Sequence, residues 1–432
     1  MWWEPFLYIL SGLAALLLIG VPVAFAFLIV IVVGILILQG GGMAFQQIAN
    51  SMYSSVASFT LVPIPLFILM GELLWHSKLA EKMLRTLDML LGRVVGRQAV
   101  LTVFAGAVFS TLSGSTMANT AILGTMMLPD MDRRGYARSM SIGPIMASGG
   151  LAMMIPPSSL GVILASLGGM SISKILIGAM LPGLIMAALY IGYIVLRCKL
   201  QPGLAPPAEV HRPPWPEVLR ACALYLLPVG LIVFLVTGLI VLGIATPTES
   251  AAMGCLGTVL IVAAYRALSR EAMVAALRGT ILVSAMCFAI LVGAVGFSQI
   301  LAFTGATRGL IDWVTGLPVA PIMVILVIML AVLVLGTFME QIAIMLITLP
   351  ILVPVVVQLG FDPIWFGILM LINLQMALTT PPFGLLLFVM KGVAPPGTGM
   401  REIYTACIPF LICDAIVIGL VILFPGLVTW YG

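Results

Sequence analysis

The chain has 432 residues, of which 62% are apolar and only 8% are charged, whereas about 25% of the residues in an ordinary soluble domain are charged. Its mean hydropathy is +1.26, so most of its surface must face lipid or other membrane-embedded protein. This excludes a soluble enzyme, a secreted disulfide scaffold and a disordered protein. The net charge of +4 is scattered, which excludes a nucleic-acid-binding protein. Continuous apolar runs of about 20 residues argue against a β-barrel.

Apolar runs in the first half predict membrane-spanning helices, and two of them contain breaks. We expect residues 1–200 to form a first repeat. Its parts are spans at 5–19, 21–38 and 60–77, an amphipathic helix on the membrane surface at 78–97, a hairpin at 98–129, a broken helix at 137–170 and a span at 174–197. The more polar residues 40–58 suggest a connector, and residues 201–218, with six prolines and several charges, predict a cytoplasmic linker.

The second half repeats this order over residues 219–432. Its parts are spans at 219–243 and 248–265, an amphipathic helix at 266–278, a span at 279–303, an interfacial stretch at 304–317, a hairpin at 319–357, a broken helix at 363–392 and a span at 403–425. Each half therefore has five spans and one re-entrant hairpin. An odd number of spans inverts the second half relative to the first.

Matched positions support the repeat. Pro129, Gly135-Tyr136 and Pro156-Pro157 recur 225 residues later as Pro354, Gly360-Phe361 and Pro381-Pro382. A matched series of this kind is much rarer than an isolated pair of prolines. The sequence thus predicts an all-α polytopic membrane protein with two inverted-topology repeats, each holding a re-entrant helical hairpin and a broken helix.

The basic residues indicate the orientation. Seventeen of the 19 Lys and Arg residues lie within, or no more than two residues from, five segments: 78–97, 130–138, 198–218, 266–278 and 391–402. The positive-inside rule places these segments in the cytoplasm and both termini in the periplasm.

The four breaks carry the candidate chemistry. A hairpin tip at Ser113-Gly114-Ser115 is expected beside the break at Pro156-Pro157, and a second tip at Gly336-Thr337 beside Thr380-Pro381-Pro382. Exposed carbonyls and hydroxyls suit Na⁺, whereas helix N-termini suit a carboxylate. We therefore expect at least two Na⁺ sites with an anionic substrate between them. Any one of these small residues also suits helix packing, so the expectation rests on the set.

Polar residues inside apolar runs are scarce, and each needs an explanation. Glu340, beside the second tip, is the strongest acidic candidate and can bind a cation or hold the tip. Asn119 and Gln375 can bond either substrate or exposed backbone. Helix N-terminal stabilisation is favoured for Glu249, while Glu72 and Asp414 are expected to face helix partners. The chain has no Gly-x-x-x-x-Gly-Lys-Ser/Thr motif, so we expect that it binds no nucleotide. The energy for transport should then come from an ion gradient or from another subunit.

With these motifs the chain resembles the large membrane subunit, of DctM-like type, of tripartite ATP-independent periplasmic (TRAP) transporters. The matching motifs run in order along nearly the whole chain: Pro63-Ile64-Pro65-Leu66-Phe67-Ile68-Leu69-Met70-Gly71, Ser113-Gly114-Ser115, Met131 to Tyr136, Ile155-Pro156-Pro157-Ser158, Pro182-Gly183, Thr246-Pro247-Thr248-Glu249, Gly336-Thr337-Phe338-Met339-Glu340 and Thr380-Pro381-Pro382-Phe383-Gly384. Each motif alone is weak, and together they are specific.

The resemblance implies a Na⁺-coupled importer of organic acids such as C4-dicarboxylates or sialic acid, with an elevator-type fold and mechanism, in the bacterial inner membrane. Its implied partners are a small four-helix membrane subunit (Q type) and a periplasmic substrate-binding protein (P type). Residues 78–97 and 266–278 resemble the family's arm helices. No enzymatic activity is implied.

The resemblance also implies the site residues. One Na⁺ would be held around Ser113, Gly114, Ser115, Ala152, Ile155 and Pro157. A second would lie around Gly336, Thr337, Ala377, Thr380 and Phe383, largely through backbone carbonyls. Ser158 and Glu340 would line the substrate path, to which we add Asn119 and Gln375. The family often has Gly in place of Ala152 and Ala377, and Asp in place of Glu340.

Three other classes of protein share some of these features. A stand-alone Na⁺/dicarboxylate-type symporter shares inverted repeats and hairpins but needs no binding protein. An intramembrane enzyme needs paired Asp, His-Glu-x-x-His or a Ser/His couple within the spans, and the sequence has none there. A structural subunit of a respiratory complex would use continuous helices, which the paired hairpins argue against.

Overall fold

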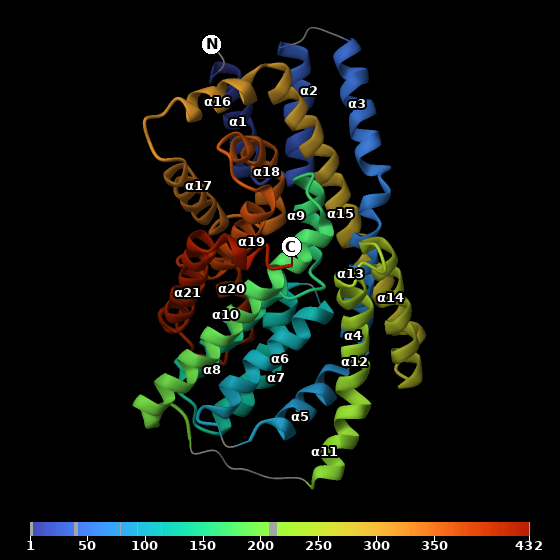
Figure 1. The fold of residues 1–432 in the computed structure, drawn as a ribbon, viewed down its shortest axis with the longest axis vertical. Coiled ribbons are helices and arrows are strands. Elements are labelled where there is room, and N and C mark those ends of the chain that lie inside the picture. Colours follow the sequence, from blue (N-terminus) through green and yellow to red (C-terminus); the bar gives the residue numbers. More distant parts are fainter. Residues whose placement is uncertain are drawn as a thin grey trace.

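The computed structural model describes residues 3–38, 42–77, 79–92, 94–113, 115–206 and 214–431, and all regular secondary structure in these ranges is helical (Figure 1). Seven of the described helical stretches are long and apolar enough to cross a membrane, and five shorter helices are also apolar. The seven are Phe59–His76, Ile172–Leu200, Trp215–Val241, Pro247–Ala264, Arg270–Phe303, Gln341–Gln358 and Met400–Leu423. The prediction of an all-α polytopic membrane protein is therefore confirmed.

The first half runs from α1 to the short helix η3, which follows the long helix α10. Its elements are α1 (Trp3–Leu18), α2 (Val23–Leu38), α3 (Gly42–Val56), η1 (Phe59–Leu61), α4 (Pro63–His76), α5 (Leu79–Leu90), α6 (Arg97–Ser113), α7 (Thr116–Arg133), α8 (Arg138–Gly150), η2 (Leu151–Met153), α9 (Ser159–Leu167), α10 (Ile172–Leu200) and η3 (Pro202–Leu204).

The second half begins with a helix that contains two π-helical turns, η4 and η5. Its elements are α11 (Trp215–Ala221), η4 (Cys222–Leu226), α12 (Leu227–Val233), η5 (Phe234–Gly238), α13 (Leu239–Val241), α14 (Pro247–Ala264), α15 (Arg270–Phe303), α16 (Ala306–Thr315), α17 (Pro321–Gly336), α18 (Gln341–Gln358), α19 (Pro363–Thr379), α20 (Leu385–Val393), α21 (Met400–Leu423) and η6 (Pro425–Leu427).

The structure corrects three of the expected boundaries. Residues 40–58 are not a connector, because α3 packs its apolar side, including Ile48, against α15. The expected break between 266–278 and 279–303 is also wrong, since α15 runs unbroken from Arg270. Gly279 lies inside this helix, where a Cβ would come within 2.7 Å of Glu72 on α4. The amphipathic helix expected at 78–97 ends at Leu90, before α6 begins.

Equivalent helices of the two halves begin with a constant spacing. Thr116 and Gln341 begin α7 and α18, and Arg138 and Pro363 begin α8 and α19, each pair 225 residues apart. The bonds Pro156-Pro157 and Pro381-Pro382, with the same spacing, are both cis. The hairpins and broken helices thus occupy matching positions in the two halves.

Two groups of helices are evident from their contacts. In one, α15 packs along α2, α3 and α4, and α14 packs on α4. The rings of Phe27 and Phe297 meet edge to face at 5.3 Å and join α2 to α15. In the other, α8 packs on α6, α7 and α21, and α19 packs on α17 and α21. Helices α5 and α11 lie at one end of the molecule, here called the arm end, and α16 lies at the other, the α16 end (Figure 1).

An ion pair connects the arm helix α5 to the first hairpin. The Arg97 guanidinium lies 3.1 Å from the Asp88 carboxylate and donates to the Asp88 carbonyl at 2.6 Å. Burial raises the pKa of the Asp88 carboxyl, while the charges of Arg97 and Arg134 act in the opposite direction. This contact ties the end of α5 to the start of α6.

Candidate functional site

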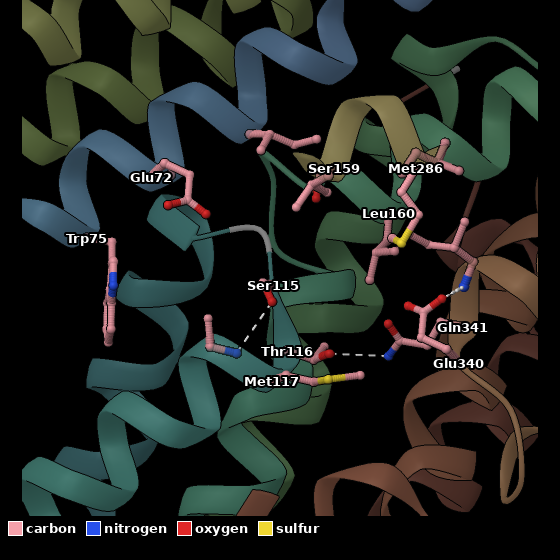
Figure 2. A pocket seen from close by; sticks show the side chains of 16 residues that line it. Glu72, Trp75, Ser115, Thr116, Met117, Ser159, Leu160, Met286, Glu340 and Gln341 are labelled. Atoms are coloured by element: carbon pink, nitrogen blue, oxygen red, sulfur yellow. Dashed lines mark hydrogen bonds between the residues drawn. The ribbon is translucent and has the colours of Figure 1, made fainter. Parts of the chain in front are cut away.

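A cavity of about 480 Å³ lies where the broken segments meet the first group of helices (Figure 2). Helices α4 and α15 form one wall, and the first residues of α7, α9 and α18 form the other. The lining residues are Ile68, Gly71, Glu72, Trp75, Ser115, Thr116, Met117, Ala118, Ser159, Leu160, Ile163, Val283, Met286, Glu340, Gln341 and Ile342. Its size is that of a pocket for a small organic molecule.

Three helix N-termini converge on this cavity, each begun by a polar capping residue. The Ser115 hydroxyl accepts from the Ala118 N–H at 3.4 Å at the start of α7. The Ser158 hydroxyl accepts from the Gly161 N–H at 3.1 Å at the start of α9. The Glu340 carboxylate accepts from the Ile342 N–H at 3.0 Å at the start of α18. The remaining first-turn N–H groups and the helix dipoles make this wall attractive to an anion.

The two hairpins meet directly at the cavity. The side-chain amide of Gln341 donates to the Thr116 hydroxyl at 3.3 Å, and both side chains are buried (Figure 2). These two residues are 225 positions apart and therefore equivalent in the repeat. Contact between equivalent positions is expected beside the axis that relates two repeats.

The charges of the cavity are all negative. Its described lining holds two carboxylates, Glu72 and Glu340, and none of these lining residues is basic. The His76 imidazole lies 3.5 Å from Glu72, one turn further along α4. An anion bound at the helix N-termini therefore needs cations beside it, because like charges repel strongly in a medium of low dielectric constant.

The first predicted Na⁺ site lies partly outside the described residues. Gly114 is outside them, and the side chain of Ser113 is not described. Ser115 lines the cavity, while Ala152 lies in η2, which packs on α6. Ile155 and Pro157 follow in the irregular segment before α9. Since Pro156 and Pro157 have no N–H, the carbonyls of Ala152 and Met153 cannot make their i+4 helical hydrogen bonds.

The structure brings two residues of the second predicted Na⁺ site, Gly336 and Ala377, into contact. Gly336 packs so closely on Ala377 that a Cβ on it would lie 2.3 Å from the Ala377 Cβ. The Thr337 hydroxyl donates to the Val334 carbonyl at 2.8 Å, and the Thr380 hydroxyl donates to the Met376 carbonyl at 2.7 Å. Hydroxyl oxygens engaged in this way keep lone pairs that can face a cation.

Phe383 takes part in this second site through its backbone at most. Its side chain is 48% exposed, and its ring lies 5.2 Å from the exposed ring of Phe338, tilted by 36°. Whether the two groups of residues bind Na⁺ stays a prediction.

The four predicted substrate-path residues occupy two kinds of position. Glu340 lines the cavity, and Ser158 caps α9 directly before the lining residue Ser159. Asn119 and Gln375 are fully buried and do not belong to the described lining. Gln375 packs against Gly150, its equivalent in the repeat, where a Cβ would lie 1.5 Å from the amide nitrogen.

Asn119 forms hydrogen bonds with neighbouring helices and does not face the cavity. Its amide nitrogen lies 3.2 Å from the Gly106 carbonyl, 3.0 Å from the Ser110 hydroxyl and 3.4 Å from the Ser148 carbonyl. It therefore ties α7 to α6 and α8. Of the two roles that the sequence left open, the structure supports the bond to backbone.

Replacing Asn119 with alanine should accordingly lower stability and leave substrate affinity nearly unchanged. Losing these buried hydrogen bonds is expected to cost about 1–3 kcal/mol. Thermal unfolding of the purified protein and the KM for uptake measure the two effects. The exposed Gln201 provides the control, since Gln201→Ala should change neither. A raised KM for Asn119→Ala with unchanged stability would place Asn119 in the substrate path after all.

The other intramembrane acids have local partners. Glu249 and Thr246 form a reciprocal capping box, with bonds of 2.8 and 3.3 Å, which confirms the N-terminal role of Glu249. Asp414 accepts a hydrogen bond from the buried Tyr190 hydroxyl on α10. Glu72 faces Gly279 of α15, as expected of a residue that meets a helix partner, and it also lines the cavity and pairs with His76 of its own helix.

Sequence reasoning missed several lining residues that follow the breaks. Thr116, Ser159 and Gln341 are the first residues of α7, α9 and α18. Their position directly after a break was the available signal, because the first turn of a helix is where side chains and N–H groups face a ligand. Trp75 gave no such signal, since it lies in an ordinary apolar run.

These features define a membrane transporter fold. The structure resembles that of the Alcanivorax borkumensis YdaH transporter with a TM-score of 0.66 at 13% sequence identity, over 89% of each chain. The sequence pattern of the family "Tripartite ATP-independent periplasmic transporter, DctM component" matches residues 10–427. The chain belongs to this family of transporter permeases, and it is not an enzyme.

Relatives with a named transport function match most of the chain. It is 30% identical to the C4-dicarboxylate TRAP transporter large permease protein DctM of Pseudomonas aeruginosa, over 90% of each chain. It is 29% identical to the sialic acid TRAP transporter large permease protein SiaM of Vibrio cholerae, over 96% of this chain and 95% of the relative. The isethionate TRAP transporter permease protein DctMQ of Oleidesulfovibrio alaskensis is 31% identical over 90% of this chain, which matches 61% of that longer protein.

Proposed function

We propose that this large permease subunit imports a small organic acid, such as a C4-dicarboxylate or sialic acid, together with Na⁺. The observation that carries the proposal is the cavity itself. Three helix N-termini converge on it, its described lining has no basic residue, and two carboxylates face the same space. Such a site suits an anion only when cations are bound as well.

The broken segments support Na⁺ as that cation. Proline pairs beside both hairpins deprive carbonyls of their helical donors. Threonine hydroxyls and small residues gather at the second hairpin tip. Neutral oxygens of this kind suit a hard cation such as Na⁺. The matching positions in the two halves support at least two such ions.

An elevator movement agrees with the position of the cavity. The cavity lies between α4 and α15 on one side and the starts of α7, α9 and α18 on the other. A displacement of the second group of helices along the first would carry the bound substrate across the membrane. The membrane is proposed to be the bacterial inner membrane, with both termini in the periplasm.

The family description names a tripartite transporter, and we propose a small four-helix membrane subunit and a periplasmic substrate-binding protein as the other two parts. The match to one part of a longer DctMQ protein supports a membrane partner that can be fused to this chain. The family match favours the tripartite transporter over a stand-alone symporter.

The test is uptake by proteoliposomes that hold this chain with its small subunit. Radiolabelled succinate and N-acetylneuraminate are offered with the cognate binding protein, under an inward Na⁺ gradient. Uptake should fall to background when K⁺ replaces Na⁺ or when the binding protein is omitted. Equal uptake in K⁺ would contradict Na⁺ coupling, and equal uptake without the binding protein would contradict the tripartite mechanism.

A further inference from the structure

A second, larger hollow lies on the α16 side of the cavity. This hollow, here called the outer chamber, has a volume of about 620 Å³. Its described lining is uncharged and contains six hydroxyl side chains and one amide. These polar residues are Ser54, Ser55, Ser58, Thr60, Ser166, Ser298 and Gln299.

A narrow apolar segment separates the two spaces. It encloses a volume of only about 10 Å³, which is about the minimum that holds a single water molecule. Apart from Ser166 and Cys287 its lining is aliphatic or aromatic. We call it the apolar collar, and its lining residues are Leu61, Ile64, Ile163, Ser166, Leu167, Cys287, Phe288, Leu291, Ile342 and Leu346.

The three spaces lie in one order along four helical segments. On α15 the cavity touches Val283 and Met286, the collar touches Cys287 to Leu291, and the outer chamber touches Ala294 to Gln299. The same order holds on α4 with η1, on α9 and on α18. The cavity, the collar and the outer chamber therefore form one path, closed at the collar.

A row of polar residues on α3 extends this path toward the α16 end. Gln46, Gln47, Asn50, Ser51 and Ser54 line a shallow hollow on one face of this helix. Ser54 also lines the outer chamber, so the polar row leads into it. This row explains why α3 is polar although it lies among apolar helices.

The outer chamber presents mainly hydrogen-bond acceptors. The hydroxyls of Ser54, Ser55 and Ser166 donate to backbone carbonyls of their own helices at 3.0, 2.7 and 2.8 Å. Their free lone pairs can accept bonds from a ligand. The buried side-chain oxygen of Gln299 has no hydrogen-bond partner in the described part of the chain, and an unpaired buried acceptor is costly unless water or a ligand binds it.

We propose that the outer chamber is a second, weaker binding site, which holds the hydroxyl groups of an organic acid before displacement of the second group of helices separates the two sides of the apolar collar. This inference rests on the proposed function, because it assumes that an organic acid enters from the α16 end. Uncharged acceptors bind a hydroxylated acid more tightly than one without hydroxyls. The collar keeps water and ions from passing between the chamber and the cavity.

The test uses two acids of equal charge and similar size, tartrate with two hydroxyls and succinate with none. The variant Ser298→Cys is made together with Cys222→Ser, which removes the partly exposed native thiol. An anionic, membrane-impermeant methanethiosulfonate is added to one face of vesicles in Na⁺-free medium. Ser298→Cys should react from the α16 face, and tartrate should slow the reaction about 2- to 10-fold, the equivalent of one net hydrogen bond, whereas succinate should not.

Two glutamine variants distinguish loss of the Gln299 acceptor from the effect of a substitution elsewhere in the protein. Gln299→Leu should abolish protection by tartrate while Ser298→Cys still reacts, and Gln201→Leu, exposed near the arm end, should retain it. Equal protection by succinate, or no reaction from the α16 face, would overturn the proposed site. These outcomes do not depend on Na⁺-driven uptake, so failure of the proposed function is detected separately.

The collar has its own reporter in the native Cys287. This thiol should stay unmodified from the α16 face in the parent protein and become reactive when Leu167→Ala and Leu291→Ala open the collar. Correct folding is checked by an unchanged gel-filtration profile and by reaction of Ser298→Cys in the same background. Reaction of Cys287 in the parent protein at the rate of Ser298→Cys would overturn the collar as a barrier.

Discussion

Replacing Gly150 with alanine should strongly destabilise the protein. A Cβ at this position would lie 1.5 Å from the side-chain nitrogen and 1.9 Å from the side-chain oxygen of Gln375, which is completely buried. Because overpacking a dense interior typically costs 1–3 kcal/mol and occasionally more, we expect a loss of about 3 kcal/mol and a clear fall in the melting temperature. Thermal unfolding of the purified protein in detergent measures it.

A second substitution should relieve this effect. Gln375→Ala removes the clashing amide, so the double variant Gly150→Ala with Gln375→Ala should regain most of the lost stability. Such coupling is expected of residues in direct contact. Gly192 on α10 is the matched control, since a Cβ there meets nothing within 4 Å. A Gly150→Ala protein as stable as Gly192→Ala would show that the two halves do not meet in this way.

Replacing Ser115 or Thr380 with tryptophan should remove Na⁺-dependent uptake. Ser115 caps the start of α7 at the cavity, and Thr380 caps the end of α19 beside the second hairpin tip. A large ring displaces the carbonyls and hydroxyls that are proposed to hold Na⁺, and we expect a loss of uptake of about 10- to 100-fold, which corresponds to about 1.4–2.8 kcal/mol of lost ion binding. Initial rates in proteoliposomes, measured against Na⁺ concentration, test this result.

The control for these variants is Thr405→Trp, at an exposed position of α21. All three proteins should reach the membrane in similar amounts, because none of the substitutions introduces a charge into a span. If both Ser115→Trp and Thr380→Trp keep the Na⁺ dependence of the parent protein, the predicted ion sites are wrong.

The local sequence pattern was enough to predict the helix breaks and the helices between them. Pro156-Pro157 and Pro381-Pro382 cannot continue a helix, so their positions predicted the two broken helices. The capping pair Thr246 and Glu249 was also a local feature, and the structure contains it. The family resemblance rested on the same glycine and proline motifs at helix breaks, because these residues restrict the backbone conformation directly.

The wrong boundaries have a common physical cause. Polarity suggested that residues 40–58 connect two spans, yet α3 is helical because one of its faces packs on α15. Charge suggested an independent helix at 266–278, yet α15 continues because Gly279 makes room for Glu72 of α4. In both cases contacts with a distant helix outweighed a local preference.

By itself, the sequence determined the membrane class, the two-fold repeat of breaks and the family, since these follow from composition and from where proline and glycine stand. Only the tertiary structure decided which polar residues face the cavity. It placed Gln341 against Thr116 at the cavity. It also placed Asn119 outside the cavity lining, although Gln341 and Asn119 lie in similar apolar runs. Which side of a buried helix meets a cavity depends on its packing partners, and those partners can be as distant in the chain as Thr116 and Gln341, which are 225 residues apart.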